Sequence, residues 1–140
     1  MVKDCPLCAP QGELEVVRTD KFRVIRVDDP DFPGYFRLIW NEHVKENSDL
    51  SEEDRLILWR ALCEIERIMN EELSPDKINL AEFGTMVPHL HWHLIARYRD
   101  DASYPDSYWS PKVRSTDEEK LVERREKTLR CAERINRRFA

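Results

Sequence analysis

Residues 87–95 read Val87-Pro88-His89-Leu90-His91-Trp92-His93-Leu94-Ile95, and this stretch holds three of the four histidines of the chain. The histidines stand at alternate positions, with large apolar residues between them. Such alternation predicts a β-strand with one face in a core, because successive side chains of a strand point to opposite sides. Side chains two residues apart lie roughly 6.5–7 Å from each other on one face. Since imidazole titrates near neutrality, the histidine face is a candidate catalytic or metal-binding site.

The composition indicates one highly charged globular domain. The chain has 140 residues, of which 41% are hydrophobic and 36% charged, and its net charge is −5. This length suits a single domain, and the negative charge argues against a general nucleic-acid-binding surface. No apolar run approaches the roughly 20 residues of a membrane span, and the first residues, 1–5, lack an apolar signal region. We therefore expect a cytoplasmic protein with no nucleic-acid partner and no membrane partner.

Hydrophobic patterns and turn residues divide the chain into short strands and two long helices. Ser51 begins a helix of about twenty residues, and Thr116 with Glu119 begins a last helix that runs to Phe139. The order of strands, helix, strands, helix predicts an α+β fold with a mainly antiparallel sheet. We place a main domain at residues 1–111 and a C-terminal helix at 112–140, packed on the same domain. The strands are expected at residues 14–18, 22–27, 35–40, 77–83 and from the histidine stretch to residue 98.

Cys5-Pro6-Leu7-Cys8 is a CxxC at the start of the chain. Two thiolates at this spacing can hold one tetrahedral metal ion, with the other ligands supplied from elsewhere. The alternative is an unrelated pair of small residues in a tight turn. A disulfide is not expected in a cytoplasmic protein. Cys63 and Cys131 each stand in a predicted helix, so we expect both to be packing residues.

The run from His89 to Ile95 matches the pattern His-φ-His-φ-His-φ-φ, in which φ is apolar. With this run the chain resembles the histidine triad (HIT) family of nucleotide hydrolases and transferases. The likeness extends from Cys5 to Trp109, and it includes the CxxC, a histidine before the helix start at Asp49-Leu50-Ser51, and a strand that carries an asparagine. The stretches 78–89 and 100–109 resemble a bacterial branch of the family, similar to diadenosine polyphosphate hydrolases.

The resemblance implies a fold, a reaction and an assembly. The fold is a five-stranded, mainly antiparallel sheet with a long helix across it and a C-terminal helix, which makes residues 1–111 the HIT domain. The substrate is a dinucleoside polyphosphate or a nucleoside phosphoramidate. His91 attacks its α-phosphate to form a nucleotidyl-histidine intermediate, and His93 donates to phosphate oxygens. No organic cofactor is implied. A homodimer is implied, and the narrow apolar stripe of the last helix also favours one.

Further substrate-binding residues are suggested beside this resemblance, and for all of them except Thr85 ordinary strand or loop filling is at least as good an explanation. Many family members carry Gly-Gln-(Ser/Thr)-Val before the triad, whereas this chain has Gly84-Thr85-Met86-Val87. A donor to the leaving group is therefore missing, or it is supplied by Thr85 and backbone amides. The other candidates are Asn79 for an amide near the phosphate, Asp28 for the ribose hydroxyls, and Phe22 and Ile25 for the walls of a base site.

A structural zinc site is expected from Cys5, Cys8, His43 and His89. Two histidines remain once His91 and His93 are assigned to the phosphate, and some HIT members that begin with CxxC bind zinc at these positions. A set of two cysteines and two histidines is a closed tetrahedral site, which stabilises rather than catalyses. In the competing interpretation, His43 and His89 hydrogen-bond to each other or to the backbone, and the cysteines are an incidental pair.

Two other classes of function stay open. A zinc-dependent hydrolase can use His89, His91 and His93 as metal ligands, but alternate positions on one straight strand span about 13 Å, which is wide for one ion. The second class is a nucleotide-binding module without turnover. The loop at 99–111 carries Tyr104, Tyr108 and Trp109, which either lie over a pocket or a subunit interface or simply cover the edge of the domain.

Overall fold

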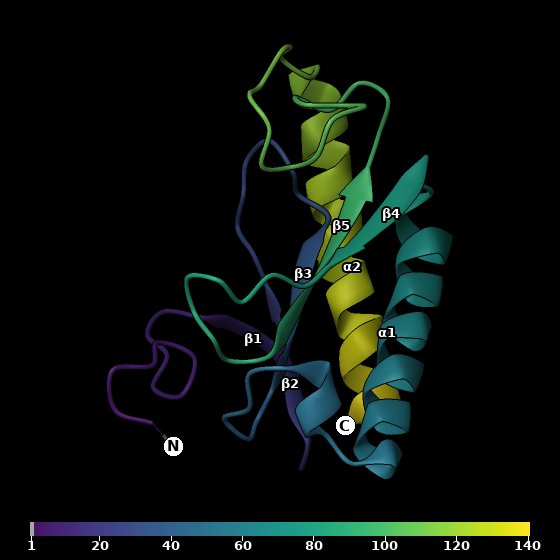
Figure 1. Cartoon of the computed structure of the whole chain (residues 1–140). Helices are drawn as coiled ribbons and strands as arrows, with labels where there is room; N and C mark the ends of the chain where they lie inside the picture. Colours follow the sequence, from purple (N-terminus) through teal and green to yellow (C-terminus); the bar gives the residue numbers. More distant parts are fainter. Residues whose placement is uncertain (1) are drawn as a thin grey trace.

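A computed structural model describes residues 2–140 and shows an antiparallel sheet with both long helices on one face (Figure 1). The strand order is β1-β2-β3-β5-β4, and every neighbouring pair is antiparallel. The predicted fold class is confirmed. The elements are β1 (Leu14–Arg18), β2 (Phe22–Arg26), β3 (Tyr35–Trp40), a 3-10 turn η1 (Asn47–Asp49), α1 (Glu52–Leu73), β4 (Lys77–Ala81), β5 (His91–Arg97) and α2 (Glu118–Phe139). Within the described residues, no helix is both long and apolar enough to cross a bilayer.

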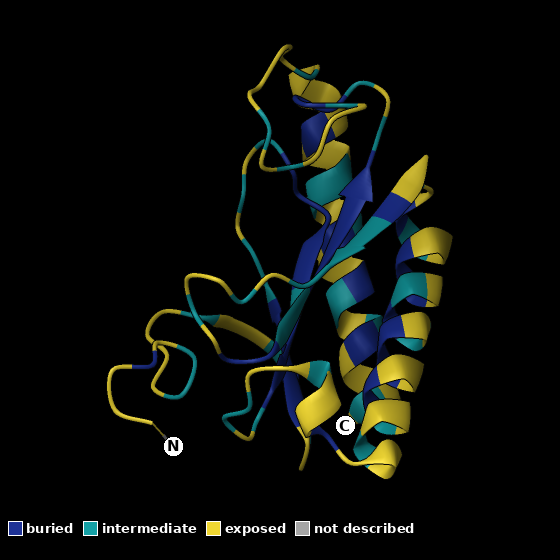
Figure 2. Ribbon diagram, in the orientation of Figure 1, coloured by how far each residue is buried: buried dark blue, intermediate teal, exposed yellow. Residues whose placement is uncertain are grey.

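Strand alternation gives the sheet two different faces. Leu94 and Ala96 point from β5 into the main core, which is closed by α1 and α2. The opposite face, called the open face below, carries His91, His93 and Ile95 and is covered by loops instead of helices. Figure 2 shows that the buried residues gather in the central strands. The alternation seen in the sequence therefore puts the imidazoles on the face that a ligand can reach.

The helix ends agree only in part with the sequence patterns. The Ser51 hydroxyl caps α1 as predicted by accepting the Asp54 N–H at 3.1 Å. The predicted last helix is present and ends at Phe139, but its predicted cap is wrong, because Asp117 is the N-cap of α2 and Thr116 instead donates to the carbonyl of Asp100 at 2.7 Å.

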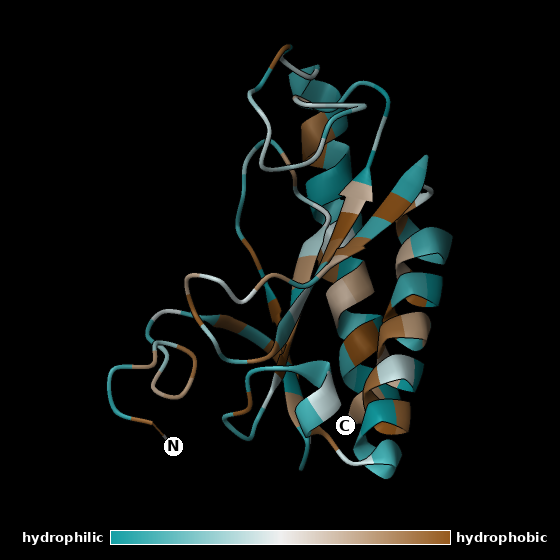
Figure 3. Cartoon of the chain, viewed as in Figure 1, coloured by the Kyte–Doolittle hydropathy of each residue, from teal (hydrophilic) through white to brown (hydrophobic). Residues whose placement is uncertain are grey.

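The C-terminal helix α2 packs against α1 and β1. Cys131 and Ile135 of α2 lie in the main core, whereas most of the helix surface is hydrophilic (Figure 3). Cys131 is buried as expected, but Cys63 is exposed because it faces outward from α1.

The strand before the histidine stretch and the strand that contains it are both shorter than the sequence patterns predict. β4 ends at Ala81 and β5 begins at His91, so residues 82–90 form a loop that runs along the open face (Figure 1). Leu90 still pairs across the chain, since its N–H donates to the carbonyl of Val44 at 2.8 Å. Because β5 begins only at His91, His89 lies before the strand, and the three histidines do not form one straight row on it.

Candidate active site and metal centre

His91 and His93 lie side by side on the open face, with ring centroids 5.1 Å apart. The Nδ1 of His91 is 2.7 Å from the backbone carbonyl of His89. A carbonyl only accepts, so Nδ1 carries the proton and Nε2 has a free lone pair. Burial lowers the pKa of His91, and the nearby charge of Arg37 lowers it further. The ring is therefore neutral at pH 7, which is the form that can attack an electrophile.

His93 is fixed by a tyrosine and an arginine from the neighbouring strand β3. The hydroxyl of Tyr35 is 2.7 Å from Nδ1 of His93, and a guanidinium nitrogen of Arg37 donates to that hydroxyl at 3.4 Å. Because the Tyr35 oxygen accepts from Arg37, its own proton points to His93, and burial raises the pKa of Tyr35 so that it stays protonated. Burial, with the charges of Arg37 and His91, lowers the pKa of His93 to about 3. His93 is thus neutral, and its remaining proton sits on Nε2, where it can be donated to a ligand.

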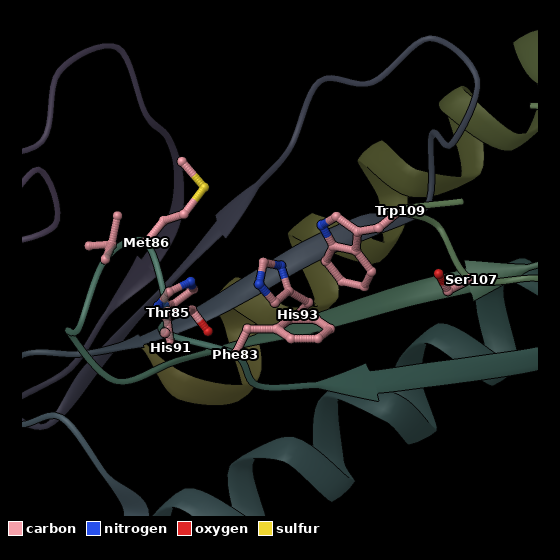
Figure 4. Close-up of a pocket in the computed structure, with 9 residues that line it drawn as sticks. Phe83, Thr85, Met86, His91, His93, Ser107 and Trp109 are labelled. Atoms are coloured by element: carbon pink, nitrogen blue, oxygen red, sulfur yellow. The ribbon is translucent and has the colours of Figure 1, made fainter. Parts of the chain in front are cut away.

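A pocket of about 460 Å³ opens beside the two histidines. Figure 4 shows Phe83 and Trp109 next to His93, and Thr85 next to His91. The Trp109 ring is 5.0 Å from that of His93 and 4.6 Å from that of Phe83. Trp109 therefore lies over a pocket. The complete lining is Phe83, Gly84, Thr85, Met86, Val87, His91, His93, Ser107 and Trp109.

The other aromatic residues of the loop at 99–111 are structural. Tyr108 packs against Phe32 and Tyr35 in a second small core, and its hydroxyl donates to Asp29 at 2.7 Å. The guanidinium of Arg97 lies 5.9 Å from the ring of Tyr104. These contacts hold the loop, and with it Trp109, against the open face.

The remaining predicted substrate residues are scattered. Asn79 lies on β4 opposite Ile95, and its side-chain oxygen accepts from Arg97 at 2.9 Å. Asp28 projects into solvent with its side chain 74% exposed, near Arg26. Ile25 is buried on the open face opposite Arg37.

Phe22 does not reach the open face. It packs into the helix-side core, where its ring is 5.4 Å from that of Phe139. The expectation that Phe22 and Ile25 wall one site is therefore wrong. Phe22 and Ile25 are three positions apart on β2, and residues an odd number apart on a strand point to opposite faces.

The four predicted zinc ligands come together at one end of the open face. The ligand atoms of Cys5, Cys8, His43 and His89 all lie within 4.8 Å of one another. Cys8 Sγ is 3.3 Å from Nδ1 of His43 and 3.4 Å from Nδ1 of His89, Cys5 Sγ is 3.4 Å from Nδ1 of His89, and the two imidazole nitrogens are 3.2 Å apart.

These spacings fit a tetrahedral zinc ion. With Zn–S near 2.3 Å and Zn–N near 2.0–2.1 Å, sulfur and nitrogen ligands stand about 3.5 Å apart and two nitrogen ligands about 3.3 Å apart. The Nε2–H of His89 donates to the carbonyl of Trp40 at 2.6 Å, which leaves Nδ1 free for a metal. The cluster can therefore hold a metal ion.

The position of His89 in this cluster argues against a zinc-dependent hydrolase in which His89, His91 and His93 bind one metal ion. Among residues 2–140, the group of possible ligands that includes His89 contains neither His91 nor His93. The ring of His89 is directed toward the cysteines, and the tautomers of the other two histidines are set by a carbonyl and a tyrosine. The arrangement favours separate roles for His89 and for the pair on β5.

Residues 12–100 match the HIT domain family. Among solved structures, a histidine triad protein from Marinobacter aquaeolei is 26% identical with a TM-score of 0.69, covering 88% of this chain and 90% of that chain. One from Bradyrhizobium japonicum is 24% identical with a TM-score of 0.69, covering 86% and 90%. A zinc-bound histidine triad family protein from Mycobacterium smegmatis is 22% identical with a TM-score of 0.59, covering 91% and 94%. A comparison with curated proteins finds no match.

Proposed function

The chain belongs to the HIT domain family, and we propose that it is a nucleotide phosphohydrolase that works through a nucleotidyl-His91 intermediate. One observation carries the proposal. Two neutral imidazoles face one pocket, and their hydrogen bonds leave a lone pair on His91 and a proton on His93. A nucleophile next to a hydrogen-bond donor is what attack on an anionic phosphate requires.

In the first step, Nε2 of His91 attacks the α-phosphorus of a nucleotide. A P–N bond forms, the bond from phosphorus to the leaving group breaks, and the leaving group departs with the bonding electron pair. The Nδ1–H of His91 keeps its bond to the His89 carbonyl, which stabilises the positive charge that the ring acquires. His93 donates its Nε2–H to a phosphate oxygen and offsets the charge that builds up there.

In the second step, water attacks the same phosphorus. The new P–O bond replaces the P–N bond, His91 is released as neutral imidazole, and a nucleoside monophosphate leaves. The lowered pKa of His91 suits it to this cycle, because a protonated His91 has no lone pair for attack.

The substrate classes that we assign are dinucleoside polyphosphates and nucleoside phosphoramidates, as in the diadenosine polyphosphate hydrolase-like branch. Thr85 lines the pocket next to His91 and can donate to the leaving group. Asn79 lines the adjoining hollow that shares Phe83 and Trp109 with the pocket. Ile25 supplies an apolar wall beyond Arg37, and Asp28 keeps its assignment to the ribose hydroxyls, although its exposed side chain lines neither hollow.

We assign zinc to the cluster of Cys5, Cys8, His43 and His89. A closed set of four protein ligands leaves no position for substrate, so this ion has a structural role. It joins the N-terminal segment to the loop that precedes β5. The use of free thiols as ligands agrees with the expected cytoplasmic location.

Product analysis tests the proposal directly. The protein is incubated in ¹⁸O-water with diadenosine and diguanosine polyphosphates and with adenosine and guanosine phosphoramidates, and the products are identified by mass. We expect nucleoside monophosphate that carries one ¹⁸O atom from at least one substrate. Failure to turn over any member of the panel would contradict the proposal and favour the nucleotide-binding module.

Tyr35→Phe is expected to lower kcat by roughly tenfold to a hundredfold, or about 1.4–2.7 kcal/mol. The change removes the hydroxyl that fixes the tautomer of His93 and leaves its Nδ1 without a partner. The KM is expected to change little, because Tyr35 lies behind His93. Steady-state kinetics measure both constants, and a kcat within a factor of two of wild type would show that Tyr35 does not position His93.

A homodimer is expected from the large apolar side chains that remain exposed. The exposed fractions of Met86, Phe83 and Trp59 are 96%, 59% and 54%. Exposed apolar groups of this size are commonly covered by a second copy. Light scattering at micromolar concentration is expected to give twice the 16.8 kDa of one chain, and a mass near 16.8 kDa would contradict the dimer.

A further inference from the structure

Strands β2, β3 and β5 each carry one arginine on the open face, and two of these three are fully paired. Arg23 donates to both carboxylate oxygens of Glu13, at 2.9 and 2.6 Å. Arg97 donates to both carboxylate oxygens of Asp101, at 2.8 and 3.1 Å, and also to Asn79. Such forked pairs are the usual solution for a buried guanidinium. Arg23 and Arg97 are therefore structural.

The third arginine, Arg37, has almost no partners. Its side chain makes one long hydrogen bond, 3.4 Å to the hydroxyl of Tyr35, and its Nε is buried without an acceptor. Among residues 2–140, no carboxylate forms an ion pair with Arg37, although the protein has 28 acidic residues. The buried Nε–H of Arg37 is costly, because it has lost water and has gained no acceptor. An anionic ligand would satisfy these donors.

Arg37 stands between the histidines and a second hollow. On β3 it lies directly opposite His93 of β5 on one side and Ile25 of β2 on the other. A hollow of about 690 Å³ is lined by Ile25, Arg37 and the N-terminal segment at 4–13. The pocket with Phe83 and Trp109 lies on the other side of the histidines. A hollow thus lies on each side of the group formed by His91, His93 and Arg37.

We infer that Arg37 binds a second phosphate, adjacent to the one that His91 attacks, and that the site selects substrates with at least two linked phosphates. This inference rests on the proposed function and narrows its substrate class. Directly opposite residues on neighbouring strands are about 5 Å apart, so Arg37 reaches a group next to the one held by His93. A dinucleoside polyphosphate supplies that second charge and places one end in each hollow. A nucleoside phosphoramidate has a single phosphate and leaves Arg37 unused.

Binding measurements test the inference without turnover. Titration calorimetry compares AMP with ADP on His91→Ala protein, and then on protein that also carries Arg37→Met. We expect ADP to bind His91→Ala at least tenfold more tightly than AMP. Arg37→Met should weaken ADP binding by tenfold or more and AMP binding by less than threefold. Arg37→Lys keeps the charge and should restore part of the preference for ADP.

The matched control is Arg26→Met on the neighbouring strand, whose side chain lies on the helix-side face. It should leave both affinities unchanged. Thermal unfolding supplies a second readout. Arg37→Met removes a guanidinium whose one hydrogen bond is the 3.4 Å contact with Tyr35, so it should not lower the midpoint, whereas Arg97→Met should lower it strongly. Equal effects on AMP and ADP, no effect on either, or a loss of midpoint like that of Arg97→Met would overturn the inference. Since no step of this test requires catalysis, it can fail while the product analysis succeeds, and the reverse also holds.

Discussion

Replacing His91 with alanine is expected to lower turnover by at least a thousandfold, about 4 kcal/mol in the activation barrier. The change removes the nitrogen that forms the covalent bond to phosphorus, and no neighbouring group can take its place. The Nδ1 of His93 is occupied by Tyr35, and its Nε2 carries a proton, so His93 presents no lone pair to the pocket. Single-turnover kinetics with the preferred substrate of the wild-type protein measure the loss.

The other properties of His91→Ala separate a chemical role from a structural one. Nucleotide affinity should stay within a few fold of wild type, because His93 and the pocket walls remain. The thermal midpoint should also be retained, since His91 is only half-buried. Cys63→Ala, an exposed change on α1, is the control for handling and expression. More than a tenth of wild-type activity in His91→Ala would rule out the covalent intermediate.

Cys5→Ala and Cys8→Ala are each expected to abolish zinc binding. Each removes one of four ligands whose spacing fits a tetrahedral ion. At free zinc about a thousand times its dissociation constant, a site present only in the folded state stabilises it by about 4.1 kcal/mol. For a domain of this size, that loss lowers the thermal midpoint by roughly 10 °C.

Elemental analysis and thermal unfolding check the zinc prediction on protein purified without a metal-binding tag. Wild type, His91→Ala and Cys63→Ala should each contain close to one zinc per chain, and the two site variants should contain none. A chelator should lower the midpoint of wild type but not that of Cys5→Ala. Zinc-free wild-type protein under non-chelating conditions would refute the site, and it would leave the chemistry of His91 untouched.

Several parts of the fold were predictable because they depend on local patterns. Alternating side chains from His91 to Leu94 specify a strand and assign the histidines to one face. Ser51 marks the start of α1, because its hydroxyl accepts an N–H that the first turn cannot satisfy. The CxxC and two spare histidines indicated which side chains cluster as a possible metal site.

Other parts were missed although the sequence carried a signal. Phe22 and Ile25 are an odd number of positions apart on a strand, so they cannot line one face. Asp117 competes with Thr116 for the N-cap of α2, and both residue types suit that position. His89 continues the alternation of the triad, but it leaves the strand because its ring is hydrogen-bonded to the carbonyl of Trp40 and directed toward the cysteines.

The sequence by itself indicated the class of fold, the histidines that share one face of β5 and the set of possible metal ligands. Only the tertiary structure decided what surrounds the histidines. β3 lies beside β5, in a register that puts Tyr35 and Arg37 next to His93, although more than fifty residues separate them in the chain. Strand order and register depend on packing of the whole sheet against α1 and α2, and no local pattern encodes them.

The same packing pairs Arg23 and Arg97 with carboxylates and leaves Arg37 without one. Whether an arginine is structural or available to a ligand is therefore decided by its neighbours in space, because acceptors are provided by residues far away in sequence.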